Sequence, residues 1–241
     1  MNKYIIETKN LTKKYGSQKS VADLNIHVQK GRIYGLLGRN GAGKTTTMKM
    51  LLGLTKPTSG EVKIWGKSLQ GNEKKLLPRI GSLIESPGFY PNLTATENLR
   101  IFATLRGVPN NHAIQDALDL VGLPYKDKKL FSQYSLGMKQ RLGIAAAVME
   151  KPDLLILDEP FNALDTSGIE MVSHLLEEEK KNGALVIFSC HDNEVLKMHS
   201  DQILELSEGR MVGESDEKEK DISYGCATSA RSLGDAGLAG K

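Results

Sequence analysis

Gly38-Arg39-Asn40-Gly41-Ala42-Gly43-Lys44-Thr45 fits the pattern of a phosphate-binding loop: Gly, any four residues, Gly, Lys, then Ser or Thr. Glycines allow the backbone to curl so that successive N–H groups point at phosphate oxygens. We expect Lys44 to neutralise the β- and γ-phosphates and the hydroxyl of Thr45 to bind Mg²⁺. The predicted phosphate-contacting residues are Gly38, Arg39, Asn40, Gly41, Ala42, Gly43, Lys44, Thr45 and Thr46.

The segments on either side of this loop support the same interpretation. Residues 32–37 read as a short strand, and residues 45–54 read as a helix with Met48 and Leu51 on one face. Phosphates bound by the loop would then lie at a helix N-terminus, where the helix dipole favours anions. A glycine-rich turn that matches the pattern by accident is the alternative, and it does not explain the strand and helix.

The composition, 39% hydrophobic and 25% charged, is ordinary for a soluble protein, and 241 residues are enough for one large α/β domain or two small ones. The 32 Lys and Arg residues are spread along the chain and nearly balanced by 29 Asp and Glu, so we expect no nucleic-acid partner. No apolar run reaches the ~18–20 residues of a membrane span, and Glu7 interrupts any secretion signal. Cys190 and Cys226 form no spaced cluster. These features predict a cytosolic protein.

Strand-like and helical segments alternate along the chain, which predicts a largely parallel sheet with an all-helical insertion. The expected strands are 4–11, 21–28, 32–37, 61–65, 80–84, 153–157, 185–189 and 202–206, and a helix is expected over 167–181. Thr94-Ala95-Thr96-Glu97 reads as a capping box at the start of the insertion. We predict one domain over residues 1–213, with the helical part at about 86–150. Residues 214–241 are charge-dense and then rich in Gly, Ala and Ser, so we expect a disordered tail that is either native or foreign to the natural gene product.

A second part of the phosphate site is predicted where the apolar strand 154–157 ends in two carboxylates. We expect Asp158 to hold Mg²⁺ beside Thr45, and Glu159 to orient or deprotonate the attacking water. The alternative is a buried strand that ends at an acidic turn before Pro160.

The segment 134–141 reads as a loop that enters a helix, with Ser135 placed to offer a hydroxyl and free N–H groups at the helix start. A plain amphipathic helix with a serine N-cap is the alternative. With this segment, the chain resembles the nucleotide-binding subunit of an ATP-binding cassette (ABC) transporter, whose signature is LSGGQxQR. Ser135, Gly137, Gln140 and Arg141 match that signature, while Tyr134, Leu136 and Met138 depart from it.

The resemblance implies roles for further residues and two cofactors, ATP and Mg²⁺. Ser135, Gly137 and Met138 would meet the γ-phosphate held by a partner subunit, and Asp165 would link the two sites across a dimer. His191 would hydrogen-bond the γ-phosphate and act in catalysis with Lys44 and Glu159. Tyr15 would stack on adenine, unless it is a core residue, and Glu85 would approach Mg²⁺ where most of the family has glutamine.

The implied fold is that of a P-loop NTPase: a mainly parallel α/β sheet core with an N-terminal antiparallel β subdomain and an inserted α-helical subdomain. The implied partners are a second ATP-binding subunit, identical or different, and a separately encoded membrane-spanning permease that holds the protein at the cytoplasmic side of the membrane. Phe89, Tyr90 and Leu93 either dock on that permease or pack the insertion against the core. Glu85 and the altered signature resemble subunits of lantibiotic-immunity and bacitracin-resistance exporters.

Two other functions compete with this interpretation. Soluble ABC ATPases of DNA repair or of ribosomes share the motifs but carry long coiled coils or two cassettes, whereas this chain has one set of motifs and no sustained heptads. A P-loop kinase or GTPase would leave the segment 134–141 and His191 unexplained.

Overall fold

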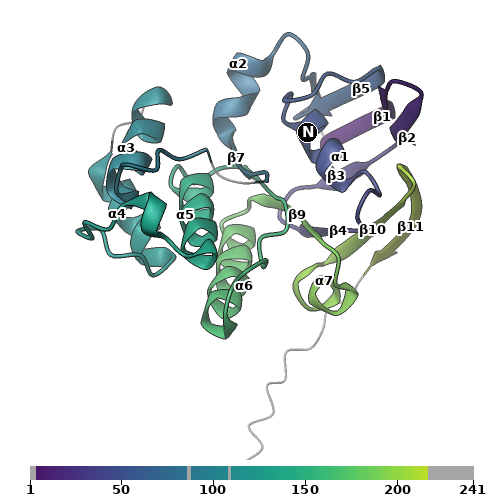
Figure 1. Ribbon diagram of the computed structural model, residues 1–241. Helices are drawn as coiled ribbons and strands as arrows, with labels where there is room; N and C mark the ends of the chain where they lie inside the picture. Colours follow the sequence, from purple (N-terminus) through teal and green to yellow (C-terminus); the bar gives the residue numbers. More distant parts are fainter. Residues whose placement is uncertain (1–3, 86–87, 108–109, 217–241) are drawn as a thin grey trace, which may run out of the picture.

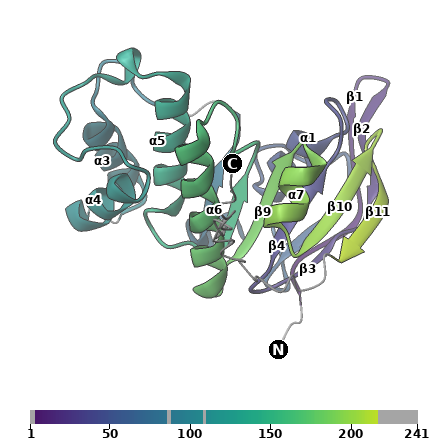
Figure 2. The same cartoon turned by 90° about the horizontal axis from the view of Figure 1, so that it is seen from below.

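The computed structural model describes residues 4–85, 88–107 and 110–216 (Figure 1). Most of the predicted tail, residues 217–241, lies outside the described residues. Within them, the chain folds into two sheets and a group of helices that lies at the opposite end of the molecule from the N-terminal sheet (Figures 1 and 2).

The central sheet has six strands in the order β11-β10-β4-β9-β8-β7. Neighbouring strands from β10 to β7 are parallel, and only β11 runs antiparallel to its neighbour β10. The strands span β4 (Ile33–Leu37), β7 (Ile80–Leu83), β8 (Leu154–Leu157), β9 (Leu185–Cys190), β10 (Gln202–Ser207) and β11 (Arg210–Asp216). Strands β8 and β9 are buried along their whole length, as expected for parallel strands covered on both faces.

The second sheet is antiparallel and is built around the long strand β1, which pairs with β2, β3 and β5. Its strands are β1 (Tyr4–Tyr15), β2 (Gln18–Leu24), β3 (His27–Gln29), β5 (Ser59–Ile64) and β6 (Lys67–Ser68). The sequence predicts one strand over 21–28, whereas the structure has a break there. At the break the Thr8 hydroxyl accepts the N–H of Ile26 and donates to the carbonyl of Leu24, so the backbone bonds to a side chain.

Seven α-helices occur in the described residues: α1 (Lys44–Leu51), α2 (Glu73–Leu76), α3 (Ala95–Leu105), α4 (Asn111–Leu120), α5 (Leu136–Val148), α6 (Thr166–Lys181) and α7 (Asn193–His199). The capping box at Thr94 is confirmed: its side chain accepts from the Glu97 N–H, and the Glu97 carboxylate accepts from the Thr94 N–H. None of the described helices has the length and apolar character that crossing a bilayer requires.

Two apolar clusters hold these layers together. One joins the central sheet to α3, α4, α5 and α6, and the other lies between the sheet, α1 and the antiparallel sheet. Phe89 belongs to the first cluster, where its ring meets Phe102 and Phe131 edge-on at 5.2 and 5.3 Å between centroids. This contact supports the packing alternative for Phe89, while the neighbouring Tyr90 is exposed.

Candidate nucleotide site

Most of the predicted site residues follow the carboxyl ends of four parallel strands. The phosphate loop follows β4, Glu85 follows β7, Asp158 and Glu159 follow β8, and His191 follows β9. Carboxyl ends of parallel strands share one edge of the sheet, which is where open α/β sheets bind ligands. The strand order therefore gathers residues that are up to 153 positions apart in the sequence, from Gly38 to His191.

The phosphate loop has the backbone that its glycines predict. Gly41 and Gly43 have φ of 84° and 99°, in the region that favours glycine. A Cβ on Gly43 would stand 2.5 Å from the carbonyl oxygen of Ser20, and one on Gly209 would stand 2.6 Å from the same oxygen. The loop is therefore held between β2 and the turn after β10, which the Gly209 N–H also ties to the Ala42 carbonyl at 3.1 Å.

Oxygen donors suited to Mg²⁺ meet beside the loop. Thr45 donates to Asp158 Oδ2 at 2.7 Å, and Ser189 donates to Asp158 Oδ1 at 2.6 Å. Asp158 is only 8% exposed, and the two hydroxyl groups hold its carboxylate in one place. Hard hydroxyl and carboxylate oxygens are the donors that Mg²⁺ prefers, and this donor set fits the ion.

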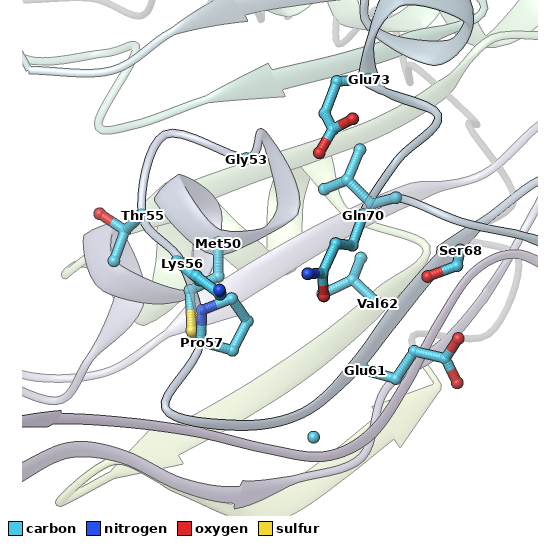
Figure 3. Close-up of a pocket in the computed structure, with 12 residues that line it drawn as sticks. Met50, Gly53, Thr55, Lys56, Pro57, Glu61, Val62, Ser68, Gln70 and Glu73 are labelled. Carbon is cyan, nitrogen blue, oxygen red and sulfur yellow. The ribbon is translucent and has the colours of Figure 1, made fainter.

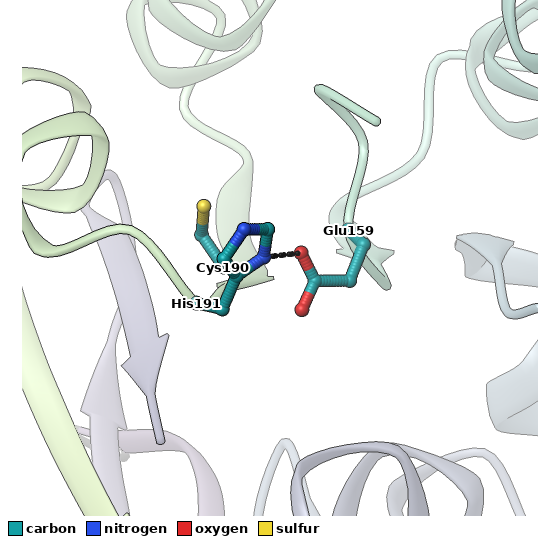
Figure 4. Close-up of side chains that lie close together, drawn as sticks. All are labelled: Glu159, Cys190 and His191. Atoms are coloured by element: carbon teal, nitrogen blue, oxygen red, sulfur yellow. Dashed lines mark hydrogen bonds and ion pairs between the residues drawn. The ribbon is translucent and has the colours of Figure 1, made fainter. Parts of the chain in front are cut away.

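Glu159 lies between two cationic or titratable groups. Its Oε1 is 3.6 Å from Lys44 Nζ, and its Oε2 is 3.1 Å from His191 Nδ1 (Figure 4). Lys44 is 6% exposed and also donates to the carbonyl of Gly38. The structure thus brings together the three residues for which the sequence predicts a catalytic role.

The backbone of Glu159 is held in an uncommon conformation. Its φ is 50°, which few residues other than glycine adopt. Its N–H donates to Ser189 Oγ at 2.9 Å, and its carbonyl accepts from Gln140 Nε2 at 3.1 Å. Such conformations persist when the surroundings fix them on both sides, and they cluster at functional sites.

Glu85 forms an ion pair with Lys49 of α1, the helix that follows the phosphate loop. Its Oε1 is 2.7 Å from Lys49 Nζ, one turn along α1 from Thr45. Glu85 has φ of 57°, and its side chain is 62% exposed. Lys49 therefore places the carboxylate on the Thr45 side of the site.

The segment 134–141 forms the start of α5, where Ser135 caps the helix by accepting from the Met138 N–H at 3.2 Å. A Cβ on Gly137 would stand 2.8 Å from the carbonyl oxygen of Ala163, so glycine permits this close approach. Across the part of the chain that the structure describes, no hydrogen bond or ion pair joins Ser135 or Met138 to residues 38–46.

Asp165 is tied to α5 as well as to its own helix α6. Its carboxylate accepts from the Gly168 N–H at 3.0 Å and from Arg141 Nη2 at 2.8 Å. The backbone bond from Gly168 and the Arg141 guanidinium hold the pKa of Asp165 below its usual value. Tyr15 is 54% exposed at the end of β1, so its ring is accessible for stacking, with Lys13 Nζ 5.0 Å from its centroid.

Three residues without a predicted role, Ser189, Lys49 and Gln140, position Asp158, Glu85 and Glu159 in the structure. Ser189 had a usable signal, because it lies at the end of a predicted strand, and the carboxyl ends of parallel strands share the sheet edge where Asp158 was expected. Lys49 lies four residues after Thr45, which puts it on the same helix face.

A surface cavity of about 220 Å³ lies between the end of α1 and strands β5 and β6 (Figure 3). Met50, Val62 and Leu69 supply its apolar lining, and Lys56, Glu61 and Glu73 supply its charged lining. None of the lining residues is among the predicted site residues.

Known proteins resemble the chain in sequence and structure. The ABC transporter family matches residues 21–162. The bacitracin transport ATP-binding protein BcrA of Enterococcus faecalis is 52% identical over 212 residues, which cover 88% of this chain and 69% of that protein. The lantibiotic transport ATP-binding protein SrtF of Streptococcus pyogenes is 39% identical over 212 residues, covering 88% and 91%.

Solved structures agree. An ATP-binding subunit of an ABC transporter superimposes with a TM-score of 0.81 at 30% identity, covering 88% of this chain and 90% of that one. A dimeric ATP-binding cassette in a post-hydrolysis state, bound to ADP and Pi, gives 0.79 at 26% identity, covering 88% and 99%. Together with the residues gathered at the sheet edge, these similarities establish that the chain belongs to the ABC transporter family, as an ATP-binding subunit that hydrolyses ATP.

Proposed function

We propose that this chain powers the export of a peptide antibiotic or a similar amphipathic compound through a separate membrane subunit. The observation that carries the proposal is the placement of Lys44, Glu159 and His191 around one point, beside the Thr45–Asp158 pair. The bacitracin and lantibiotic transport proteins that resemble the chain support the substrate class. A soluble ABC ATPase is the weaker alternative, because relatives with transport names align over most of the chain.

The residue roles follow from charge and position. The phosphate loop and Lys44 bind the β- and γ-phosphates, and Tyr15 stacks on the adenine. Thr45 and Asp158 hold Mg²⁺, with Glu85 beside them; when bound, the ion offsets negative charge on the phosphates. Glu159 takes a proton from the attacking water, or orients it, and His191 hydrogen-bonds the γ-phosphate.

Lys44 and His191 both contact the Glu159 carboxylate. A triphosphate offers both groups a competing anion. ATP binding therefore frees Glu159 from these contacts, and the carboxylate becomes available to water only when substrate is present.

The serine cap of α5 completes the site from a second chain. Among the residues that the structure describes, no hydrogen bond or ion pair joins Ser135, Gly137 or Met138 to the phosphate loop of their own chain, so they are available to the γ-phosphate of a partner. A two-fold axis then pairs each phosphate loop with the other chain's α5, as an isologous interface requires. Asp165, held by Arg141 at the same end of α5, lies at this interface.

The experiment is to express the chain with the membrane subunit encoded beside it, in cells sensitive to bacitracin and to a lantibiotic. The transporter should raise the inhibitory concentration of at least one of them, and Glu159→Gln should abolish the increase. Glu178→Gln, on the exposed face of α6, is the matched control and should retain it. Resistance that persists in Glu159→Gln would separate this chain from the export, and a chain that never co-purifies with a membrane protein would favour the soluble alternative.

A further inference from the structure

Three side chains with different donor atoms converge where β8 and β9 end (Figure 4). One donor atom from each of Glu159, Cys190 and His191 lies within 4.8 Å of the other two. The two strands are adjacent and parallel, with Leu157 opposite Phe188, so their following residues meet at the same edge. The proposed hydrolysis gives Cys190 no task.

We propose that Glu159, Cys190 and His191 bind Zn²⁺ or a similar borderline-soft divalent ion in the nucleotide-free protein, and that this ion blocks hydrolysis. The proposed metal binding depends only on these three side chains and not on the proposed function. The block rests on the proposed function, because it requires Glu159 and His191 to serve ATP hydrolysis.

The geometry is close to that of a three-ligand zinc site. Zn²⁺ bonds to thiolate, imidazole and carboxylate at about 2.0–2.3 Å in a tetrahedron, which places ligand atoms about 3.3–3.8 Å apart. His191 Nδ1 and Glu159 Oε2 are already 3.1 Å apart, and a shift of about 1 Å closes the widest pair. The His191 side chain is 63% exposed, so solvent and ions reach the cluster from the side of this ligand.

The donor chemistry separates this cluster from the Mg²⁺ donors. Thiolate and imidazole select zinc-like ions, whereas the hydroxyl and carboxylate oxygens of Thr45 and Asp158 suit Mg²⁺. A coordinating thiol loses its proton to the metal. The two kinds of ion therefore have different sites along the same edge of the sheet.

The local charge favours a cation on balance. Burial raises the pKa of the Cys190 thiol, and the carboxylates of Glu159 and Asp192 raise it further. Those carboxylates attract a divalent ion. Lys44 opposes it, but Lys44 lies 3.6 Å from Oε1 of Glu159, whereas His191 Nδ1 lies 3.1 Å from the other oxygen, Oε2.

The binding test uses the nucleotide-free, full-length protein with Cys226→Ser, so that Cys190 is its one cysteine. Co²⁺ is the spectroscopic probe, because thiolate coordination gives it an intense near-ultraviolet band. We expect that band to saturate at one equivalent and to disappear when Zn²⁺ is added. Cys190→Ser in the same background should remove the band and weaken Zn²⁺ binding by more than the ~10- to 100-fold typical of losing an outer partner. Absence of the thiolate band in the Cys226→Ser protein would overturn the proposal.

The activity test titrates Zn²⁺ against hydrolysis of MgATP. Zinc should inhibit the Cys226→Ser protein and should lose this effect on Cys190→Ser, whose zinc-free activity stays normal. Serine keeps the side-chain size and can accept the Asp192 N–H that Cys190 Sγ accepts at 3.4 Å. Equal inhibition of both proteins would refute the block at this site. A thiolate–cobalt band in a protein without zinc-free ATPase activity would count against the proposed function alone, and the cobalt titration also stands if Cys190→Ser fails to fold.

Discussion

Lys44 has two oxygen partners, the carbonyl of Gly38 and the carboxylate of Glu159. Its replacement by alanine should weaken ATP binding itself, because a buried charge is lost from the phosphate cradle. Hydrogen bonds to charged groups contribute about 1.5–3 kcal/mol, so the Kd should rise ~10- to 100-fold. Equilibrium binding of a fluorescent ATP analogue measures this. Lys74→Ala, on the exposed side of α2, is the control and should bind ATP normally. Normal ATP affinity in Lys44→Ala would contradict the role of Lys44 in binding the phosphates.

Glu85 allows a second test at the scale of one residue. Glu85→Gln removes a metal-attracting charge and breaks the ion pair with Lys49. The pair is largely exposed, so unfolding should change by no more than about 1 kcal/mol. The Mg²⁺ concentration for half-maximal ATPase activity should rise, because an amide is a weaker ligand than a carboxylate. Glu61→Gln, in an exposed pair with Lys63, should change neither quantity; an unchanged Mg²⁺ requirement in Glu85→Gln would remove Glu85 from the metal site.

At this scale, the sequence predicts residues that carry chemistry better than residues that position them. Lys44, Asp158 and Glu159 stand in local patterns whose spacing is fixed by the phosphates and the metal. Ser189 and Gln140 reach Asp158 and Glu159 only because β8, β9 and α5 meet in three dimensions. The spacing of residues within one segment therefore does not predict these two contacts.

Among the elements, helix α5 begins at Ser135, which caps the helix and also belongs to the surface proposed to bind the partner's γ-phosphate. Ser135→Ala should cost ~0.5–2 kcal/mol by leaving the Met138 N–H without its acceptor. It should also reduce ATP-dependent dimerisation. Thr94→Ala removes the comparable cap of α3 and is the matched control, since it should cost similar stability and leave dimerisation intact. Denaturant unfolding and light scattering with ATP measure the two effects; equal dimerisation in both variants would make Ser135 a cap and nothing more.

The contact between β7 and α5 is unusually close. A Cβ on Gly81 would overlap the carbonyl oxygen of Ala147, so Gly81→Ala must push strand and helix apart. We expect a loss of ~1–3 kcal/mol, typical of overpacking. Gly88→Ala is the control, because nothing lies within 4 Å of a Cβ there. Thermal unfolding measures the stability of both variants. A Gly81→Ala protein as stable as the control would show that β7 and α5 can move apart without loss of stability.

Elements were predictable where apolar periodicity or capping fixes them. The strands β4, β8 and β9 and the helices α3 and α6 lie within a few residues of their expected places. The break between β2 and β3 was missed because the Thr8 side chain, in a different strand, replaces a ladder partner. Strand β11 extends to Asp216 despite its charged sequence, since one edge of an antiparallel strand tolerates exposed charge.

For the whole molecule, the separation of α5 from the phosphate loop predicts ATP-dependent pairing. Glu159→Gln should bind ATP and accumulate as a dimer, because hydrolysis that would open the dimer falls ~10²- to 10⁴-fold. Size-exclusion chromatography with MgATP, and without it, measures the shift. Adding Ser135→Ala to this variant should reduce the dimer fraction. A protein that stays monomeric at saturating MgATP would argue against shared sites.

The backbone of Ser20 has a consequence for exchanging parts between related cassettes. Gly43 and Gly209 both pack against its carbonyl oxygen, so closely that a Cβ on either would stand 2.5 or 2.6 Å from it. The strand β2, the phosphate loop and the β10–β11 hairpin therefore meet at this one atom. The Ser20 hydroxyl also donates to Thr46 Oγ1 at 2.9 Å, so the side chain as well as the peptide at this position contacts the phosphate loop. A chimera that grafts a foreign leading sheet onto this chain should therefore work only when the donor's main chain follows the same course at that point.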